Sequence, residues 1–312
     1  MDMQRSSPRQ ANRLAKTGAD VPAISPDPGG RHPDLRPSMT SDHAFSLIAL
    51  RCLECMVANQ EATARGDSEA LHKMRISITC LKAAVSFFSS MVAGDQWRRL
   101  KLEFKWLNSH LGAARDLDVV IGRLAVNGDG QNLTPKLSHD WSSSHTRAAT
   151  ALKSERFRRL IANAAEWIQH GDWRRPDETA AHPVRAMTIS DYAFRRLTRW
   201  RGQILRRSSE LAVMDPETRH RLRIKTKRLR YAMEWFGEFL PGSTPKILRA
   251  TLRQLRRAQT CLGELNDAER ARALLKPSGA DAGQAATPKR DKQLIRTTQA
   301  AFEALIALTQ EN

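Results

Sequence analysis

The chain has 312 residues, which is enough for two domains of ordinary size, and 41% of them are hydrophobic, which is enough for helical cores. No apolar run approaches the roughly 20 residues that a membrane-spanning helix needs, and the first residues lack the apolar segment of a signal peptide. The four cysteines form no disulfide pattern, and we interpret the Cys52-x-x-Cys55 pair as helix packing rather than a metal or redox site. We therefore expect a protein of the reducing cytoplasm that is not associated with a membrane.

The formal net charge of +18 is concentrated in the C-terminal part of the chain. Residues 1–42 contribute +1, residues 43–184 contribute +4 and residues 185–312 contribute +13. The first of these segments is rich in Pro, Ser and Arg and lacks apolar periodicity, so we predict a disordered tail. Since the tail carries almost none of the charge, the charge predicts a folded basic surface that attracts an anionic partner.

The rest of the chain has helical periodicity, and no segment shows the period-two alternation of a strand. We therefore predict an all-α fold in which loops at 127–130, 171–189 and 277–288 interrupt the helices. The helices are predicted at residues 43–64, 68–92, 96–125, 138–169, 190–214, 216–240, 246–275 and 291–308.

The segment from Arg219 to Arg230 carries Lys or Arg at more than half of its positions and contains no acidic residue. On a helix, some of these side chains form a line along the axis, while Tyr231 belongs to an apolar line that we expect to be buried. Like charges one turn apart repel by a few tenths of a kcal/mol per pair, so we expect an anion from outside the chain to neutralise the line. The line consists of His220, Arg223, Lys227 and Arg230.

A similar histidine-led segment occurs in the first half of the chain. Its predicted helix follows Asp67, as the later one follows Asp215, and aspartate is a favourable residue at the N-cap of a helix. The aligned positions are His72 with His220, Arg75 with Arg223, and Lys82 with Arg230.

A second matched pair lies downstream of each histidine-led segment. The first copy reads LGAARD at residues 111–116, and the second reads LGELND at residues 262–267. Because the two motifs recur in the same order and at nearly the same spacing, we predict an internal duplication. The two repeats are predicted at residues 43–184 and 185–312.

This doubled pattern resembles the CHAD family, the conserved-histidine α-helical domains. The shared pattern is His-x-x-Arg-[Ile/Val]-x-x-[Lys/Arg]-x-x-[Arg/Lys] followed by Leu-Gly-x-x-(Arg)-Asp, and the resemblance extends from about residue 42 to the C-terminus. It implies two pseudo-symmetric antiparallel helical bundles around a basic central cavity that binds inorganic polyphosphate without catalysis, cofactor or metal. It also implies a place on polyphosphate granules, where other proteins could be partners. The implied binding residues are His72, Arg75, Lys82, Arg115, His220, Arg221, Arg223, Lys227, Arg228 and Arg230.

The first repeat departs from the family pattern at Thr79, where the family usually has a basic residue. This loss of a cation, together with the uneven charge, predicts that the second repeat binds more strongly. Charge reversal at Arg223 or Arg230 is then expected to weaken polyphosphate binding more than charge reversal at Arg75 or Lys82.

The Leu-Gly motifs contain residues for which we expect different roles. Arg115 matches the family's arginine, whereas Asn266 replaces it in the second copy. The acids Asp116 and Asp267 are expected to orient a motif Arg or His through a charge-assisted hydrogen bond. A glycine inside a helix costs about 1 kcal/mol relative to alanine, so Gly112 predicts close packing by a neighbouring element.

The sequence gives less support for two other functions, an enzyme and a nucleic-acid-binding protein. A phosphate-processing enzyme would need a site that the chain does not offer, because there is no GxxxxGK[ST] loop and the His139-Asp140 dipeptide stands alone. A pI of about 10.6 suits nucleic acid, but no DNA-binding motif accompanies the basic helices, so we expect only non-specific binding.

Overall fold

The computed structural model describes residues 34–126, 135–174, 182–275 and 287–310. Every regular element in these ranges is a helix, which confirms the predicted all-α class. No helix in this part of the chain combines the length and the apolar character needed to cross a membrane. Most of the predicted tail and the predicted loops at 127–130 and 277–288 lie largely or wholly outside the described residues.

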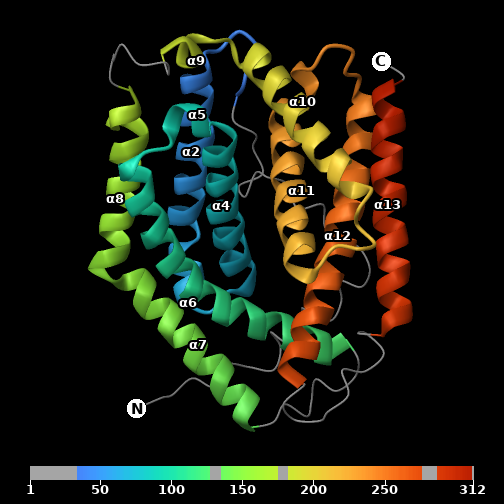
Figure 1. Cartoon of the computed structure of the whole chain (residues 1–312). Helices are drawn as coiled ribbons and strands as arrows, with labels where there is room; N and C mark the ends of the chain where they lie inside the picture. Colours follow the sequence, from blue (N-terminus) through green and yellow to red (C-terminus); the bar gives the residue numbers. More distant parts are fainter. Residues whose placement is uncertain (1–33, 127–134, 175–181, 276–286, 311–312) are drawn as a thin grey trace. The chain divides into compact units, whose positions relative to one another are not determined.

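The helices follow one another along the whole described chain (Figure 1). They are α2 (Ser41–Ala58), α3 (Gln60–Ala64), α4 (Ser68–Phe87), α5 (Ser89–Val92), α6 (Asp95–Val126), α7 (Pro135–Lys153), α8 (Glu155–His170), η2 (Asp172–Arg174), α9 (His182–Ala186), α10 (Ile189–Ser208), α11 (Pro216–Phe236), η3 (Gly237–Phe239), α12 (Pro245–Leu275) and α13 (Pro288–Gln310).

The chain divides into two compact units, which we describe separately. The first unit contains residues 46–82 and 92–177, and the second contains residues 34–45, 83–91 and 178–312. The histidine-led part of α4 therefore belongs to the first unit, and α11 belongs to the second. The predicted repeat boundaries and the cavity implied between the repeats stay predictions.

Two of the helices that we predicted as continuous are interrupted in the first unit. At Asn59 the side-chain amide donates to the carbonyl oxygen of Cys55 at 2.8 Å, and α2 ends just before it. At Ser154 the hydroxyl accepts a hydrogen bond from the backbone N–H of Phe157, so the serine is the N-cap of α8. In both places a short polar side chain bonds the backbone locally, which competes with a continuing helix.

The end of the predicted tail is ordered, which corrects our expectation for residues 34–42. The backbone N–H of Ile189 donates to Met39 at 2.7 Å, and that of Ser190 donates to Pro37 at 3.2 Å. The N–H of Ser41 donates in turn to Met187 at 2.9 Å. These bonds join the segment before α2 to the start of α10, and composition alone does not predict such long-range backbone pairing.

An aromatic cluster forms the core of the second unit. Phe87 stacks on Phe236 with ring centroids 5.1 Å apart, and Phe88 stacks on Tyr192 at 5.2 Å. The Tyr192 hydroxyl donates to the carbonyl oxygen of Phe87 at 2.8 Å, so its buried polar group is satisfied. In the same unit α12 packs between α11 and α13, and α10 packs on α11 (Figure 1).

In the first unit α6 packs against α7 and α8. Trp97 of α6 stacks on Trp167 of α8 at 5.3 Å between ring centroids. Further along α6, the buried carboxylate of Asp118 accepts a hydrogen bond from the Trp141 indole at 2.8 Å and lies 2.9 Å from His145 Nε2. These contacts fix both ends of α6, the helix that carries the first Leu-Gly motif.

All four cysteines are free and buried, in agreement with the packing role expected for Cys52 and Cys55. The described residues contain no group of His, Cys, Asp and Glu side chains that could hold a metal ion.

We predict that Phe87→Ala lowers the free energy of unfolding by about 3–5 kcal/mol, because it removes a fully buried ring from the aromatic cluster. Denaturant unfolding followed by circular dichroism measures the loss. Phe194→Ala is the matched control, since Phe194 on α10 is 47% exposed and should cost much less. Equal losses in the two variants would show that the cluster is not the core of this unit.

Candidate anion-binding site

The helix α11 begins after Asp215, a favourable N-cap residue. The Asp215 carboxylate accepts a hydrogen bond from the backbone N–H of Thr218 at 2.8 Å, and Pro216 occupies the first helical position. The apolar face of the helix is buried through Leu222, Leu229 and other core residues. This burial fixes the rotation of α11 and therefore the direction in which each basic side chain leaves the helix.

His220 is held by the second Leu-Gly motif. Its Nδ1 lies 2.7 Å from the side-chain oxygen of Asn266 on α12. The Asn266 amide nitrogen lies 3.5 Å from Asp267, so the amide oxygen faces the imidazole and Nδ1 carries the hydrogen. Nε2 remains for a ligand. The orienting residue is thus Asn266, and among the described residues no motif His or Arg donates the expected hydrogen bond to Asp267.

Arg223 lies against the glycine of the same motif. A Cβ atom at Gly263 would be 3.5 Å from Arg223 Nε and 3.7 Å from Nη2. Because glycine has no side chain, the guanidinium reaches the surface of α12 directly. Its Nε is buried and has no hydrogen-bond partner among the described residues.

Arg75 has the same environment in the first unit. A Cβ atom at Gly112 of α6 would lie only 2.9 Å from Arg75 Nη1, which is buried and has no hydrogen-bond partner among the described residues. This contact is the close packing that Gly112 predicted. Burial lowers the pKa of Arg75, Asp116 opposes that shift, and Arg115 adds to it. Asp116 thus acts on Arg75 through space, and no hydrogen bond between the two is formed.

Arg75 and Arg223, which the predicted duplication aligns, have similar environments, and the duplication itself stays a prediction. In each unit a histidine-led helix directs its arginine onto the glycine of a Leu-Gly motif. In each case a buried guanidinium nitrogen lacks a hydrogen-bond partner among the described residues. An unsatisfied buried donor costs about 1–3 kcal/mol, and more when it is charged, so both arrangements favour a bound acceptor.

Lys82 is a half-buried cation in the first unit. Burial lowers its pKa, and the neighbouring charge of Lys101 lowers it further. The residue one turn later on α4 is Ser86 rather than an acid. Within the described part of the chain Lys82 forms no ion pair, so its charge is available to an anion.

Arg230 differs from its counterpart Lys82, and its position corrects our expectation of an open basic line. The side chain is 1% exposed, and Nη1 lies 2.7 and 2.9 Å from the carboxylate oxygens of Glu234. Its Nε donates to Gln259 at 2.9 Å, and its guanidinium stacks over Tyr231 at 4.3 Å. Arg230 is therefore a buried structural cation rather than a ligand-binding one.

The acid that neutralises Arg230 was missed by the sequence analysis. Glu234 also accepts a hydrogen bond from Arg256 at 2.9 Å. Burial raises the pKa of Glu234, while the guanidinium groups of Arg230 and Arg256 oppose that rise. The spacing of four residues from Arg230 to Glu234 is typical of an ion pair on a helix, and this signal could have identified the pair.

The remaining predicted binding residues of α11 lie on different faces of the helix. Arg221 is exposed and pairs with Glu217 at 2.6 Å, so its charge is already compensated. Arg228 is half-buried on another face of α11, and burial lowers its pKa. Lys227 lies on the His220 line, with its Nζ 5.9 Å from the ring centroid of Tyr231.

Tyr231 is buried, as predicted. In the first unit His72 and Arg115 are half-buried, on α4 and α6 respectively. Thr79, which replaces a cation, donates its hydroxyl to the carbonyl oxygen of Arg75 at 2.9 Å. The first unit thus brings together His72, Arg75 and Arg115, and the second brings together His220, Arg223 and Lys227.

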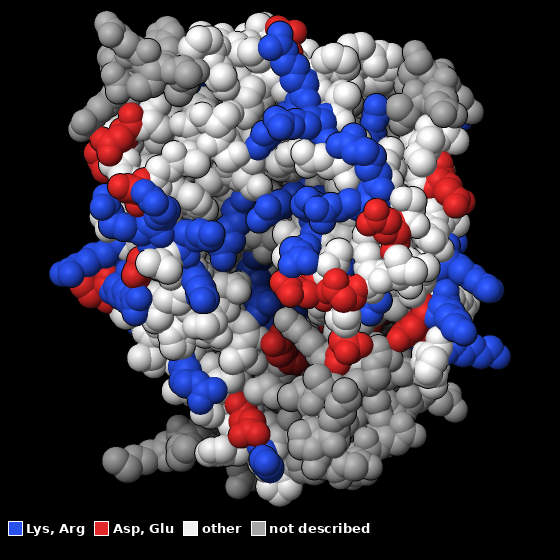
Figure 2. All heavy atoms as spheres, viewed as in Figure 1, with Lys and Arg blue, Asp and Glu red and all other residues white. Residues whose placement is uncertain are grey.

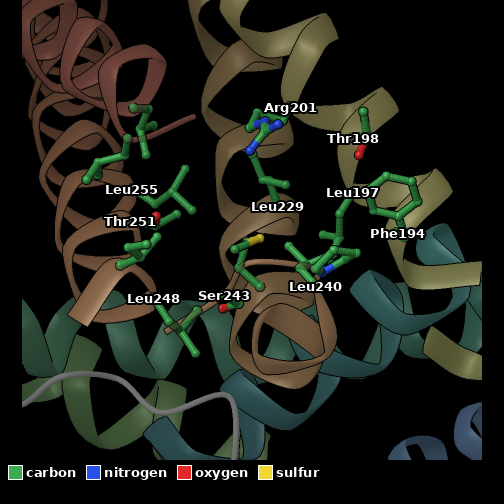
Figure 3. Close-up of a pocket in the computed structure, with 15 residues that line it drawn as sticks. Phe194, Leu197, Thr198, Arg201, Leu229, Leu240, Ser243, Leu248, Thr251 and Leu255 are labelled. Atoms are coloured by element: carbon green, nitrogen blue, oxygen red, sulfur yellow. The ribbon is translucent and has the colours of Figure 1, made fainter. Parts of the chain in front are cut away.

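Basic side chains gather in clusters on the face of the molecule shown in Figure 2, with fewer acids between them. A separate cavity of about 270 Å³ in the second unit is mostly apolar (Figure 3). It is lined by residues of α10 to α13, and Arg201 is its one charged lining residue among those described. The chemistry of this cavity does not suit a polyanion, so the basic residues of α4 and α11 form the candidate site.

The comparisons with known proteins agree with this arrangement. A family model described as the CHAD domain matches residues 47–276. The crystal structure of the CHAD domain from the plant Ricinus communis is similar, with 27% sequence identity and a TM-score of 0.68. That similarity covers 86% of this chain and 94% of the plant chain. No curated protein matches the chain.

We predict that Glu234→Gln lowers the free energy of unfolding by about 3–5 kcal/mol, because it leaves the buried charge of Arg230 uncompensated. Thermal and denaturant unfolding measure this loss. In the control Glu217→Gln, the ion pair to Arg221 is solvent-exposed, and the expected cost is below about 1 kcal/mol. A Glu234→Gln protein as stable as the control would mean that Arg230 finds another partner.

Proposed function

Because the chain belongs to the CHAD family, we propose that it binds inorganic polyphosphate and does not alter it chemically. The proposed binding residues lie on the two histidine-led helices and in the first Leu-Gly motif. They are His72, Arg75, Lys82 and Arg115 in the first unit, and His220, Arg223 and Lys227 in the second. The observation that carries this proposal is the seating of Arg75 and Arg223 on glycines, each with a buried nitrogen that lacks a partner among the described residues.

Polyphosphate suits these residues chemically. It is a linear chain with about one negative charge per phosphate, and its binding to several cations releases counterions, as for nucleic acids. An arginine contributes a planar group that can donate to two phosphate oxygens together. Phosphate oxygens would accept hydrogen bonds from the nitrogens of Arg75 and Arg223 that do not face the glycines.

The histidines can also donate hydrogen bonds to phosphate. The hydrogen bond to Asn266 keeps the Nδ1 hydrogen of His220 away from the ligand. Nε2 can therefore donate to phosphate only when the imidazole carries a second hydrogen.

We infer binding rather than turnover from the character of the site. Phosphoryl transfer generally uses divalent ions held by carboxylates, and the described residues offer clustered cations but no cluster of acids suited to a metal. His139 and Asp140 are exposed on α7, outside the candidate site. Polyphosphate granules in the cytoplasm are then the proposed location, where other proteins could be partners.

Neutralising substitutions test the proposal. Arg223→Gln should weaken polyphosphate binding about tenfold and Lys82→Gln by a smaller factor, because each removes a charge-assisted contact and the second repeat is expected to bind more strongly. Isothermal titration with long-chain polyphosphate measures the change. Arg221→Gln and Arg98→Gln are matched controls, since both arginines are exposed and paired with acids on their own helices.

Equal losses in all four variants would indicate that net charge alone attracts the ligand. DNA is a useful competitor in the same titrations. If the site recognises polyphosphate, polyphosphate should displace DNA at a much lower phosphate concentration than the reverse. The opposite order of displacement would favour a nucleic-acid-binding protein instead.

The pH dependence gives a second test. Burial and Lys101 lower the pKa of Lys82 below the ordinary 10.5, so its charge is present below the lowered pKa and lost as the pH rises through it. Polyphosphate binding should therefore weaken as the pH rises through this lowered pKa, at a lower pH than that at which exposed lysines lose their charge. Lys82→Arg should remove this weakening, since arginine stays protonated. An unchanged pH profile in Lys82→Arg would exclude Lys82 from the site.

A further inference from the structure

The apolar cavity of the second unit is large for a space inside a helical core. Its volume is about 270 Å³ (Figure 3), whereas close-packed protein interiors contain few voids larger than a water molecule. Sites for drug-sized ligands measure about 300–1,000 Å³, so this cavity suits a smaller ligand. At about 30 Å³ for each water-sized group, it holds roughly nine such groups, which is the size of a short hydrocarbon chain.

Four helices each present one face to the cavity. The residues of α10 that line it occupy positions i, i+3, i+4 and i+7, which share one face of a helix. They are Phe194, Leu197, Thr198 and Arg201. The walls formed by α11, α12 and α13 are mostly aliphatic, and they include the buried side chains of Leu229, Leu255 and Leu305.

Two short side chains leave part of this space unfilled. Thr251 of α12 lies between Leu248 and Leu255 on the face that lines the cavity, and Ser243 lines it just before α12 begins. Threonine and serine occupy less volume than the leucines beside them. The cavity therefore follows from residue size at these two positions.

The cavity opens to solvent beside α10 and has one charged residue there. Phe194 and Thr198 are both exposed, and they mark the opening. Arg201, one turn after Thr198, is half-buried and forms no hydrogen bond or ion pair with a described residue. The positions three and four residues before and after it on α10 contain no acid. Burial lowers the pKa of Arg201, and no described acid opposes that shift.

One cation beside apolar walls favours a ligand with one negative charge and an apolar body. A carboxylate can accept two hydrogen bonds from the planar guanidinium of Arg201, and the Thr198 hydroxyl can donate another. The body of the ligand must be apolar, because burying a polar group without a hydrogen bond is unfavourable. A polyanion would place its further charges against leucine side chains, so this cavity differs in chemistry from the polyphosphate-binding residues.

We propose that the cavity binds a small apolar monocarboxylate, a fatty acid of about eight carbons, with its carboxylate on Arg201 and its chain between α11, α12 and α13. Each CH₂ group that enters the cavity strengthens binding about fourfold. This site does not depend on the proposed function, because it shares no residue with the proposed polyphosphate-binding set.

The test is isothermal titration of the full chain with hexanoate, octanoate and the neutral octan-1-ol. Octanoate should bind about tenfold more tightly than hexanoate, because two more CH₂ groups are buried, and more tightly than octan-1-ol. Arg201→Met should weaken octanoate binding about tenfold and leave octan-1-ol binding unchanged, since it removes only the charge. Arg199→Met is the matched control, because Arg199 is exposed on the same helix, and it should bind both ligands as the wild type does.

A second pair of variants tests the place of the chain. Thr251→Phe should abolish binding of both octanoate and octan-1-ol, because the ring takes up the space that the chain would fill. Thr251→Val keeps the volume of the side chain and should retain binding. Thermal unfolding checks that each variant folds, and the comparison of Arg201→Met with Arg199→Met decides the proposal if Thr251→Phe does not.

Equal affinities of octanoate and octan-1-ol for the wild type would overturn the proposal, as would equal losses in Arg201→Met and Arg199→Met. Sedimentation velocity identifies a different occupant. If the wild type self-associates, Thr251→Phe abolishes the association and octanoate does not bind, a second copy of the chain fills the cavity and the proposal fails. Arg223→Gln should leave octanoate binding unchanged, so this inference and the proposed function can fail independently.

Discussion

The candidate site depends on one packing constraint, the contact between a motif arginine and a helical glycine. A Cβ atom at Gly112 would lie 2.9 Å from the Arg75 guanidinium, which is too close for a side chain, and a Cβ atom at Gly263 would lie 3.5 Å from the Arg223 guanidinium, in ordinary van der Waals contact. A helical glycine costs about 1 kcal/mol relative to alanine. In both Leu-Gly motifs the arginine lies against the glycine, and this contact fixes the direction of its guanidinium group.

The basic residues of α11 have three different environments, which differ in the free energy that an acidic or anionic partner contributes. The charge of Arg230 is buried, and such a charge would cost several kcal/mol without Glu234. Arg221 forms an exposed pair worth at most about 1 kcal/mol. Arg223 forms no ion pair with a described acid, and its Nε is buried without a hydrogen bond there, so it gains most from an anion. A count of positive charges does not distinguish these environments.

The sequence predicted the elements that depend on local signals. Asp67 and Asp215 indicated the starts of α4 and α11, and helical periodicity indicated the line from His220 to Arg230. Its last residue, Arg230, is instead buried and paired with Glu234. Contacts between residues far apart in the chain could not be predicted, such as the hydrogen bond from Arg196 to Ser86. These contacts depend on how helices pack, which no local pattern encodes.

The central claim is that polyphosphate binds through direct contacts to Arg75 and Arg223, and the salt dependence of its affinity tests this most directly. The logarithm of the association constant should fall linearly with the logarithm of salt concentration. In the double variant Arg75→Gln/Arg223→Gln the slope should be smaller by about two, one for each phosphate contact removed. An identical slope in the wild type and this variant would contradict the account, because the two arginines would then not contact the bound chain.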